Sequence, residues 1–359
     1  MSLIDQVIRP DIRTMSAYAV ANSDGFLKLD AMENPYSLPE KLKTELARRL
    51  SEIALNRYPV PSYTRLKAKI CKKMGIPEGY DVILGNGSDE LISLIALACA
   101  KKDEPAKVVA PVPGFVMYAL SAQFAGMEFV GVPLKPDFTL DTEAMLSAIE
   151  KHRPTVVYLS QPHNPTGTLF GEKDVLRIIN AMSDKGIVIS DEAYQPFAEA
   201  SFMSKLPQYP NLVVMRTVSK LGLAGIRLGY MSAVPELLAE FDKVRPPYNV
   251  NVLTEAAAEF AMDHIDVFNH QASIIRSERE KLAVALKKLP KIEVFPSRAN
   301  FLLIRMPKAE EVFEKLLARK VLIKNIGKMH PLLQNCLRLT VSSPEENQIF
   351  LEQFSACIQ

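Results

Sequence analysis

The stretch that decides the fold reads Thr155-Val156-Val157-Tyr158-Leu159, then a helical pattern over 172–185, then Gly186-Ile187-Val188-Ile189-Ser190. The two short runs are rich in β-branched residues, which favour strands. The segment between them has the apolar spacing of an amphipathic helix. A strand, a helix and a second strand in this order are typical of a unit whose strands lie parallel. The stretch therefore predicts an α/β fold.

The same alternation runs from about residue 80 to residue 235. Further strand-like segments are 82–84, 107–110, 127–132, 212–215 and 226–230. Helical patterns separate several of them, over 88–101, 118–126 and the stretch that Asp141 caps up to about residue 152. We expect a mainly parallel sheet flanked by helices. Ligands of such sheets bind where strands end, so the polar residues after each strand become candidates for a site.

A second pattern follows the hinge-like segment Arg245-Pro246-Pro247-Tyr248-Asn249. A long helical pattern over 252–289 precedes short strand-like runs and a further helix over 309–320, which indicates a smaller α+β domain. We expect three parts: an N-terminal arm with part of the small domain, a large domain and a small C-terminal domain. Their ranges are 1–45, 46–247 and 248–359.

Composition narrows the functional classes. The chain has 359 residues, of which 48% are hydrophobic and 23% charged, with a formal net charge of +2. This balance is that of an ordinary globular protein and favours no nucleic-acid partner. No apolar run reaches the roughly 20 residues that cross a bilayer, and no signal peptide is recognisable. Scattered cysteines and histidines without ligand spacing predict a cytoplasmic protein without a metal.

The first candidate site motif is Ser219-Lys220, with Arg227 seven residues after the lysine. It combines an amine, a hydroxyl and a guanidinium that suits a phosphate. A lysine able to form an imine beside a phosphate anchor is what the chemistry of pyridoxal phosphate (PLP) requires. Taken alone, the pair is weak support, because most lysines are exposed surface charges.

Two further motifs follow predicted strands. Asp191 comes directly after a strand and can pair with a protonated pyridine nitrogen, while Tyr194 can donate to a ring oxygen. A helix N-cap is the alternative for this run. Asn164 stands in the rigid turn Ser160-Gln161-Pro162-His163-Asn164-Pro165-Thr166-Gly167, where its amide can bind the same oxygen or serve a plain turn.

Two motifs complete the set. Gly87, Ser88 and Asp89 open a predicted helix, where backbone N–H groups can hold a phosphate. Phe115 follows the next strand and can stack on an aromatic ring, although core packing is the usual role of phenylalanine. Several strand ends that carry suitable residues argue for one shared site more strongly than any single motif.

Together these motifs resemble the fold-type I PLP enzymes of the aspartate aminotransferase superfamily, and within it the histidinol-phosphate aminotransferase branch. The resemblance spans nearly the whole chain in family order. The runs that carry it are Met32-Glu33-Asn34-Pro35-Tyr36, Arg57-Tyr58-Pro59, Gly87-Ser88-Asp89-Glu90, Asn164-Pro165-Thr166-Gly167, Asp191-Glu192-Ala193-Tyr194, Ser219-Lys220, Leu223-Ala224-Gly225-Ile226-Arg227-Leu228-Gly229 and Leu337-Arg338-Leu339-Thr340-Val341.

The resemblance implies a role for each cofactor residue. Lys220 bonds covalently to the cofactor and later moves a proton, and Asp191 pairs with the pyridine nitrogen. Asn164 and Tyr194 contact the ring oxygen, and Phe115 stacks on the ring. The residues implied to hold the phosphate are Gly87, Ser88, Asp89, Ser219, Arg227 and, from the neighbouring subunit, Tyr58. A homodimer with shared active sites follows from that last role.

The resemblance also implies substrate residues. Arg338 matches an arginine that binds an anionic group of the substrate, and Tyr18 matches a tyrosine that closes over the substrate phosphate. Two positions depart from the branch. Lys324 stands where a second arginine is usual. Lysine keeps the positive charge but cannot form the two parallel hydrogen bonds of a guanidinium. Met32 stands where asparagine is frequent, so a polar contact is expected to be missing.

The implied reaction moves an amino group between glutamate or 2-oxoglutarate and histidinol phosphate or imidazole-acetol phosphate, in histidine biosynthesis. Three alternatives stay open. An aminotransferase for aromatic or other amino acids shares every cofactor residue. A threonine-phosphate decarboxylase resembles the branch but loses a carboxylate. A non-catalytic PLP-binding or regulatory protein is disfavoured by the presence of Lys220, Asp191 and Arg227 together.

Overall fold

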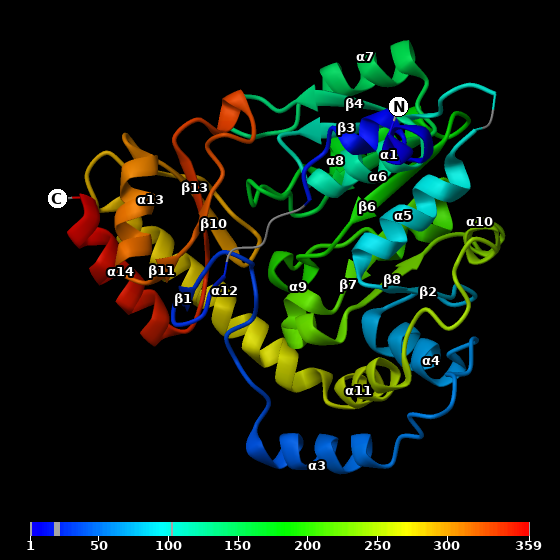
Figure 1. Ribbon diagram of the computed structural model, residues 1–359, viewed down its shortest axis with the longest axis horizontal. Helices are drawn as coiled ribbons and strands as arrows, with labels where there is room; N and C mark the ends of the chain where they lie inside the picture. Colours follow the sequence, from blue (N-terminus) through cyan, green and yellow to red (C-terminus); the bar gives the residue numbers. More distant parts are fainter. Residues whose placement is uncertain (1, 18–21, 102, 359) are drawn as a thin grey trace.

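The computed structural model describes residues 2–17, 22–101 and 103–358, and within these ranges its largest sheet has seven strands (Figure 1). In spatial order they are β2 (Ile83–Asn86), β8 (Leu228–Ser232), β7 (Leu212–Thr217), β6 (Ile187–Asp191), β5 (Val156–Ser160), β3 (Lys107–Val112) and β4 (Glu128–Pro133). Only β8 runs antiparallel to its neighbours, β2 and β7. The mainly parallel sheet predicted from the sequence is therefore confirmed.

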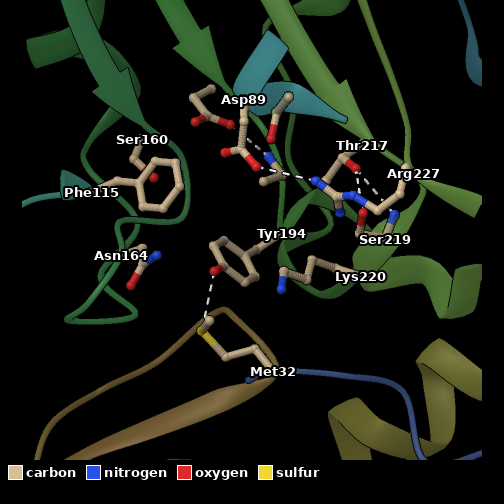
Figure 2. Close-up of a pocket in the computed structure, with 13 residues that line it drawn as sticks. Met32, Asp89, Phe115, Ser160, Asn164, Tyr194, Thr217, Ser219, Lys220 and Arg227 are labelled. Carbon is tan, nitrogen blue, oxygen red and sulfur yellow. Dashed lines mark hydrogen bonds and ion pairs between the residues drawn. The ribbon is translucent and has the colours of Figure 1, made fainter. Parts of the chain in front are cut away.

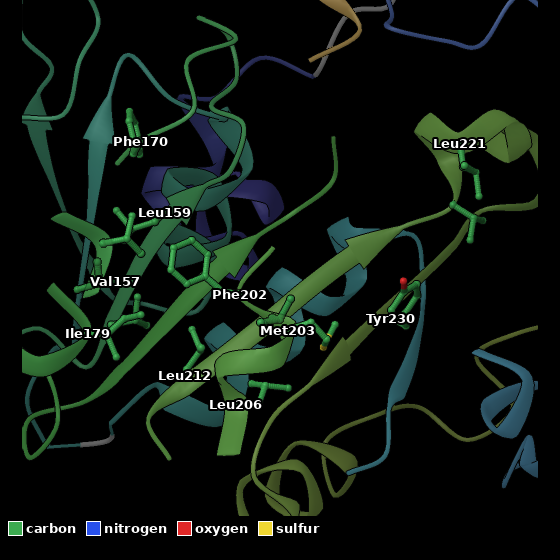
Figure 3. Close-up of a cluster of buried hydrophobic side chains, with 14 of the residues drawn as sticks. Val157, Leu159, Phe170, Ile179, Phe202, Met203, Leu206, Leu212, Leu221 and Tyr230 are labelled. Carbon is green, nitrogen blue, oxygen red and sulfur yellow. The ribbon is translucent and has the colours of Figure 1, made fainter. Parts of the chain in front are cut away.

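The central strands are apolar along their whole length because both faces of the sheet are covered. In β5, Val157 and Leu159 belong to one buried cluster, which Figure 3 shows, while Val156 and Tyr158 belong to a second cluster. Successive side chains of a strand point to opposite faces. A strand buried on both faces has no polar alternation, which explains the continuous β-branched run in the sequence.

Helices connect the strands and cover the sheet. They are α4 (Thr64–Met74), α5 (Ser88–Cys99), α6 (Val116–Phe124), α7 (Thr142–His152), α8 (Glu172–Ala181), α9 (Gln195–Ala198) and α10 (Pro235–Asp242). Asp141 caps α7 as predicted, because its side chain accepts a hydrogen bond from the N–H of Ala144 at 3.0 Å. The expected helix over 172–185 ends earlier, at Ala181, with Met182 as its C-cap.

A second, antiparallel sheet has its own buried cluster (Figure 1). Its strands are β12 (Lys324–Asn325), β13 (Cys336–Thr340), β10 (Phe301–Arg305) and β9 (Glu293–Val294), with α13 (Ala309–Ala318) and α14 (Pro344–Ile358) packed beside it. The N-terminal part comprises α1 (Leu3–Val7), α2 (Pro10–Arg13), β1 (Leu27–Lys28) and α3 (Glu40–Ser51). Strand β1 pairs with β11 (Val321–Leu322), so the start of the chain joins this second unit.

The sequence predicts one long helical stretch over 252–289, and the structure has two helices there. Helix α11 (Val252–Asp263) ends and α12 (Ile265–Lys287) begins at His264, which has φ −115° and ψ 27°. The N–H of His264 bonds to the carbonyls of Phe260 and Ala261 and closes the first helix. Apolar spacing continues through the break, so the sequence pattern does not reveal it. None of the helices described here has the length and hydrophobicity to span a bilayer.

A buried ion pair ties two neighbouring strands together. Arg216 lies in β7 and Glu192 directly follows β6; the guanidinium Nε donates to Glu192 Oε2 at 2.9 Å, and the carboxylate side chain is 0% exposed. The same carboxylate accepts hydrogen bonds from Ser201 Oγ at 2.7 Å and from the N–H of Phe202 at 2.6 Å. A buried charge is costly unless it is paired and hydrogen-bonded. Both conditions hold for Glu192.

We expect Glu192→Gln to lower the free energy of unfolding by about 3 to 5 kcal/mol, because it leaves the Arg216 guanidinium buried without its counter-charge. Chemical denaturation of the full chain measures this loss. The matched control is Glu199→Gln, since Glu199 is 64% exposed in its pair with Arg276 and exposed pairs contribute roughly 0 to 1 kcal/mol. Equal losses in the two variants would contradict the role given to the buried pair.

Candidate active site

One pocket gathers most of the residues that the sequence singled out (Figure 2). It lies at the carboxyl ends of β5, β6 and β7 and beside the amino end of α5, where α/β sheets bind ligands. The residues that line it are Met32, Ser88, Asp89, Phe115, Ser160, Asn164, Asp191, Ala193, Tyr194, Thr217, Ser219, Lys220 and Arg227.

An anion-binding cradle lies where α5 begins. Gly87 has φ 79°, and a Cβ at this position would lie 2.5 Å from Arg227 Nη2. Glycine therefore keeps the first turn of the helix, at Ser88 and Asp89, open toward the guanidinium. Arg227 Nη2 also donates to Asp89 Oδ2 at 3.1 Å, with both side chains nearly half exposed.

Hydroxyl groups of the lysine-bearing segment complete the cradle. Ser219 Oγ lies 2.9 Å from Thr217 Oγ1, and Figure 2 shows both beside Arg227. Thr217 Oγ1 also accepts from the N–H of Ser219 at 3.1 Å, which holds the two side chains in a fixed relation. A guanidinium, hydroxyls and a helix amino end form a donor set that suits a phosphate group.

Asp191 presents a buried carboxylate from the end of β6. Its Oδ2 accepts a hydrogen bond from Tyr118 Oη at 2.6 Å, and its Oδ1 accepts one from the N–H of Ala193 at 3.1 Å. Burial raises the pKa of Asp191 to about 6, although these two hydrogen bonds oppose the shift. The carboxylate thus stands in the pocket with both oxygens anchored.

Lys220 lies in the short helical turn Ser219–Leu223 after β7. Its Nζ donates to the carbonyl oxygen of Ala31 at 3.0 Å and lies 5.9 Å from the centre of the Tyr194 ring. Burial lowers the pKa of Lys220 to about 8, and the neighbouring positive charges of Arg338 and Arg227 add to the shift. An amine of this kind is partly neutral near pH 7 to 8, which a nucleophile or a general base requires.

Arg338 contacts the wall of the pocket from the second sheet. Its Nη1 donates to Asn164 Oδ1 at 2.8 Å and its Nη2 donates to the carbonyl oxygen of Asp30 at 3.0 Å. The guanidinium lies over the ring of Phe301, at 5.5 Å from the ring centre. Two residues predicted separately, Asn164 and Arg338, are therefore in direct contact.

Met32 makes a contact that the sequence did not suggest. Its Sδ accepts a hydrogen bond from Tyr194 Oη at 3.2 Å, as Figure 2 shows. The Met32 backbone has φ 57° and is held by the Thr340 hydroxyl and the Asn300 amide. The sequence predicts that a polar contact is missing at Met32. In the structure, the Met32 sulfur instead accepts a weak hydrogen bond.

Four of the described residues that were predicted for the site do not line this pocket: Gly87, Arg338, Lys324 and Tyr58. Lys324 pairs with Arg338 across β12 and β13, and directly paired residues of antiparallel strands point to the same face. Tyr58 is 80% exposed and stacks on Tyr248, with ring centres 4.7 Å apart. Tyr18 lies outside the described residues.

Sequence reasoning missed four residues that shape the site. Ser160 and Ala193 lie inside the quoted motifs but were given no role there, and Thr217 stands two positions before Ser219. Tyr118 is different, because the sequence pattern predicts only that it begins a helix. It stands three positions after Phe115, which on a helix places it near the same face.

The described part of the chain has no group of three or more His, Cys, Asp or Glu side chains that could hold a metal. His163, which stands in the Asn164 turn, is buried, and its Nε2 lies 2.7 Å from the carbonyl oxygen of Pro113. Burial lowers the pKa of His163 to about 4. A neutral imidazole bonded to backbone serves the turn rather than the pocket.

The donor set fits PLP on observations of this structure: a cradle that a Cβ at Gly87 would fill, a buried carboxylate at Asp191 and an amine of lowered pKa at Lys220. On a mainly parallel sheet, this arrangement defines a transferase of PLP fold type I. The sequence model of the family "Aminotransferase class I and II" matches residues 24–354.

Known proteins agree with this class. The chain is 60% identical over 361 residues to histidinol-phosphate aminotransferase 2 of Cupriavidus pinatubonensis, covering 100% of this chain and 98% of that protein. It is 58% identical to histidinol-phosphate aminotransferase 1 of Ralstonia nicotianae, covering 99% and 96%. The chain therefore belongs to the class I and II aminotransferases, in their histidinol-phosphate aminotransferase branch.

A solved structure shares the fold. The histidinol-phosphate aminotransferase of Sinorhizobium meliloti, solved in complex with pyridoxal-5'-phosphate, superposes with a TM-score of 0.86. The match covers 98% of this chain and 97% of that chain at 22% sequence identity, so it supports the fold. The fold class expected from the sequence is confirmed by the family match and by this neighbour.

We expect the Lys220 amine to titrate with a midpoint near pH 8. Its modification by a small acylating reagent, followed by peptide mass spectrometry across pH, measures this midpoint. Arg338→Met should raise the midpoint, because it removes a positive charge that disfavours the ammonium form, and Arg338→Lys should leave it close to the wild-type value. Exposed Lys243 is the internal control; a midpoint for Lys220 equal to that of Lys243 would contradict the assignment.

Proposed function

We propose that this protein is a PLP-dependent histidinol-phosphate aminotransferase of histidine biosynthesis. It moves an amino group between glutamate or 2-oxoglutarate and histidinol phosphate or imidazole-acetol phosphate. The observation that carries the proposal is the single pocket that joins the Lys220 amine, the buried Asp191 carboxylate and the cradle at Gly87. The shared name of the two bacterial relatives supports the choice of substrate.

The part of the pocket near Asp191 and Phe115 is assigned to the cofactor ring. When bound, PLP supplies an electron-withdrawing ring that stabilises negative charge on the substrate carbon that loses a proton. Asp191 would hold the ring nitrogen in its protonated form, and Phe115 would pack against the ring. Asn164 and Tyr194 would contact the ring oxygen, for which Tyr194 must turn its hydroxyl away from Met32.

The cofactor phosphate is assigned to the cradle. It would be held by charge-assisted and backbone hydrogen bonds from Gly87, Ser88, Asp89, Ser219 and Arg227. The half-exposed Arg227 can exchange its contact with Asp89 for a phosphate oxygen at little cost, because exposed ion pairs are weak.

Lys220 is the group that forms the bond to the cofactor and moves the proton. With a pKa near 8, a fraction of the amine is neutral at physiological pH and can accept a proton from the substrate carbon. The ammonium form can then return the proton to the cofactor side. The Ala31 carbonyl, 3.0 Å from Nζ, orients the amine in the pocket wall.

Arg338 is assigned to the anionic group of each substrate, together with Lys324 on the paired strand. A guanidinium can bind the carboxylate of glutamate or the phosphate of histidinol phosphate by forked hydrogen bonds. Arg338 already holds Asn164, so substrate binding and the ring-oxygen contact share one network. Tyr18 is retained as a substrate-phosphate residue on the family resemblance.

We further propose a homodimer in which Tyr58 reaches the cofactor phosphate of the neighbouring subunit. Two features support it: the described helix α3 has no buried residue, and Tyr58 is exposed while stacking on Tyr248, which is also exposed. We also propose the part boundaries 1–45, 46–247 and 248–359. Four unpaired cysteines suit a reducing compartment and support a cytoplasmic location.

The two alternative enzymes would use the same cofactor residues but form different products. An aromatic aminotransferase would share the pocket and differ at substrate positions such as Lys324 and Met32. A threonine-phosphate decarboxylase would release the carboxylate in place of the proton. The name shared by relatives at 58% to 60% identity favours histidinol phosphate over both.

Mixing the PLP-loaded protein with histidinol phosphate should convert the cofactor absorbance to that of its amine form, and 2-oxoglutarate should reverse the change with formation of glutamate. Lys220→Ala should abolish turnover while its unfolding transition is retained, because it removes the only group assigned to the proton transfer. A loaded protein that ignores histidinol phosphate but releases carbon dioxide from phosphothreonine would replace the proposal by the decarboxylase alternative.

Arg338→Ala should raise the KM for both glutamate and histidinol phosphate by roughly 10- to 100-fold, the equivalent of about 1.5 to 3 kcal/mol for hydrogen bonds to a charged group. Steady-state kinetics with each substrate measures the effect. Arg319→Ala is the matched control, because Arg319 follows the last turn of α13, donates to Gln353 Oε1 at 3.0 Å and does not line the pocket. Unchanged KM values for both substrates would reject the role of Arg338.

A further inference from the structure

The carboxylate of Asp191 has a partner that no motif predicted. Tyr118, on the first turn of α6, donates its hydroxyl to Asp191 Oδ2 at 2.6 Å. Both side chains are buried, with 2% and 4% of their surfaces exposed. A short hydrogen bond to a buried carboxylate is among the stronger interactions that a neutral donor makes.

Ring contacts hold Tyr118 in place. Its ring stacks on Tyr158 of β5 at 4.4 Å between centres and 9° between planes. It also meets the ring of Phe115 edge to face, at 5.6 Å between centres and 86° between planes. One helix start thus carries both the residue assigned to stack on the cofactor ring and the residue that holds Asp191. The hydroxyl of Tyr118 cannot leave the carboxylate without disturbing both ring contacts.

The charged and titratable groups around Asp191 come from several elements. Glu192 follows it in the chain, Asp89 approaches from α5, and Tyr118 approaches from α6. Tyr158 of β5 and Tyr194 also interact with its charge. Burial and the two acidic neighbours raise the pKa of Asp191, while the hydrogen bond from Tyr118 lowers it. Burial also raises the pKa of Tyr118 well above its ordinary value, so its hydroxyl keeps the proton that it donates to Asp191.

We propose that Tyr118 is a positioning residue for the reaction: its hydroxyl holds the Asp191 carboxylate turned toward the cofactor ring nitrogen and keeps it negatively charged. The second oxygen is fixed by the Ala193 N–H, so each oxygen retains a lone pair for the cofactor. Tyr118 touches neither the cofactor nor the substrate in this role. The proposal rests on the proposed function, because it concerns the residue assigned to the ring nitrogen.

The sign of the pH effect follows from the raised pKa of Asp191. A carboxyl group with a raised pKa contributes stability in its neutral form, which is present at low pH and lost as the pH rises through about 6. Removing the Tyr118 hydroxyl raises this pKa further, so more stability is lost at pH 8 than at pH 5. A purely structural hydrogen bond would cost the same at both pH values.

The test uses Tyr118→Phe, which keeps the ring and both ring contacts. Chemical denaturation of the cofactor-free full chain between pH 5 and pH 8 should show a larger loss at pH 8, equivalent to a rise of about one pH unit in the Asp191 midpoint, as deletion of one hydrogen bond to a charged group predicts. In the background of Asp191→Asn this pH dependence should vanish. Tyr158→Phe is the matched control, since it removes a hydroxyl from the neighbouring ring without touching Asp191.

Cofactor binding provides the second readout. Titration with PLP at pH 8 should give a dissociation constant on the order of 10-fold higher for Tyr118→Phe than for wild type or Tyr158→Phe. Equal losses of stability at pH 5 and pH 8, with unchanged affinity for PLP, would overturn the proposal. These measurements are independent of the proposed function. A wild-type protein that binds PLP but does not transaminate histidinol phosphate would reject the proposed function, and the stability and affinity measurements on Tyr118→Phe would still test the role of Tyr118.

Discussion

The buried ion pair between Glu192 and Arg216 is the interaction on which the pocket depends. It joins the ends of β6 and β7, and the residues beside it in the chain are Asp191 and the segment that leads to Lys220. Desolvating two charges is expensive, and the pair is tolerated because Ser201 and the backbone of Phe202 and Met74 satisfy the remaining donors and acceptors. Because the two strand ends cannot slide, a carboxylate and an amine from different strands face one cavity.

Burial shapes the chemistry of that cavity by acting on two groups of opposite charge. It raises the pKa of Asp191 to about 6 and lowers that of Lys220 to about 8, so both groups move toward neutral pH. Each has a neighbour that adjusts the shift: Tyr118 favours the charged carboxylate, and Arg338 disfavours the charged amine. General acid–base groups work best when their pKa values lie near the working pH, and burial brings Lys220 close to this condition.

The N-terminal segment takes part in the site despite its weak sequence pattern. Three consecutive residues accept hydrogen bonds there: the carbonyl of Asp30 from Arg338, the carbonyl of Ala31 from Lys220, and the sulfur of Met32 from Tyr194. Residues that follow strands of the large sheet and a residue of the second sheet therefore meet on one short, bent segment of chain. Backbone carbonyls carry no side-chain signature, and this explains why the first two contacts could not be predicted.

The sequence by itself determined the fold class, since β-branched runs and helical spacing are local patterns, and it identified the strand-end residues Asp191 and Lys220 through motifs of neighbouring residues. Only the tertiary structure decided what those residues touch. The bond from Tyr118 to Asp191 joins positions 73 apart in the chain, and the bond from Arg338 to Asn164 joins positions 174 apart. Such contacts depend on the order of strands in the sheet and on how the second unit packs, and no local periodicity encodes either.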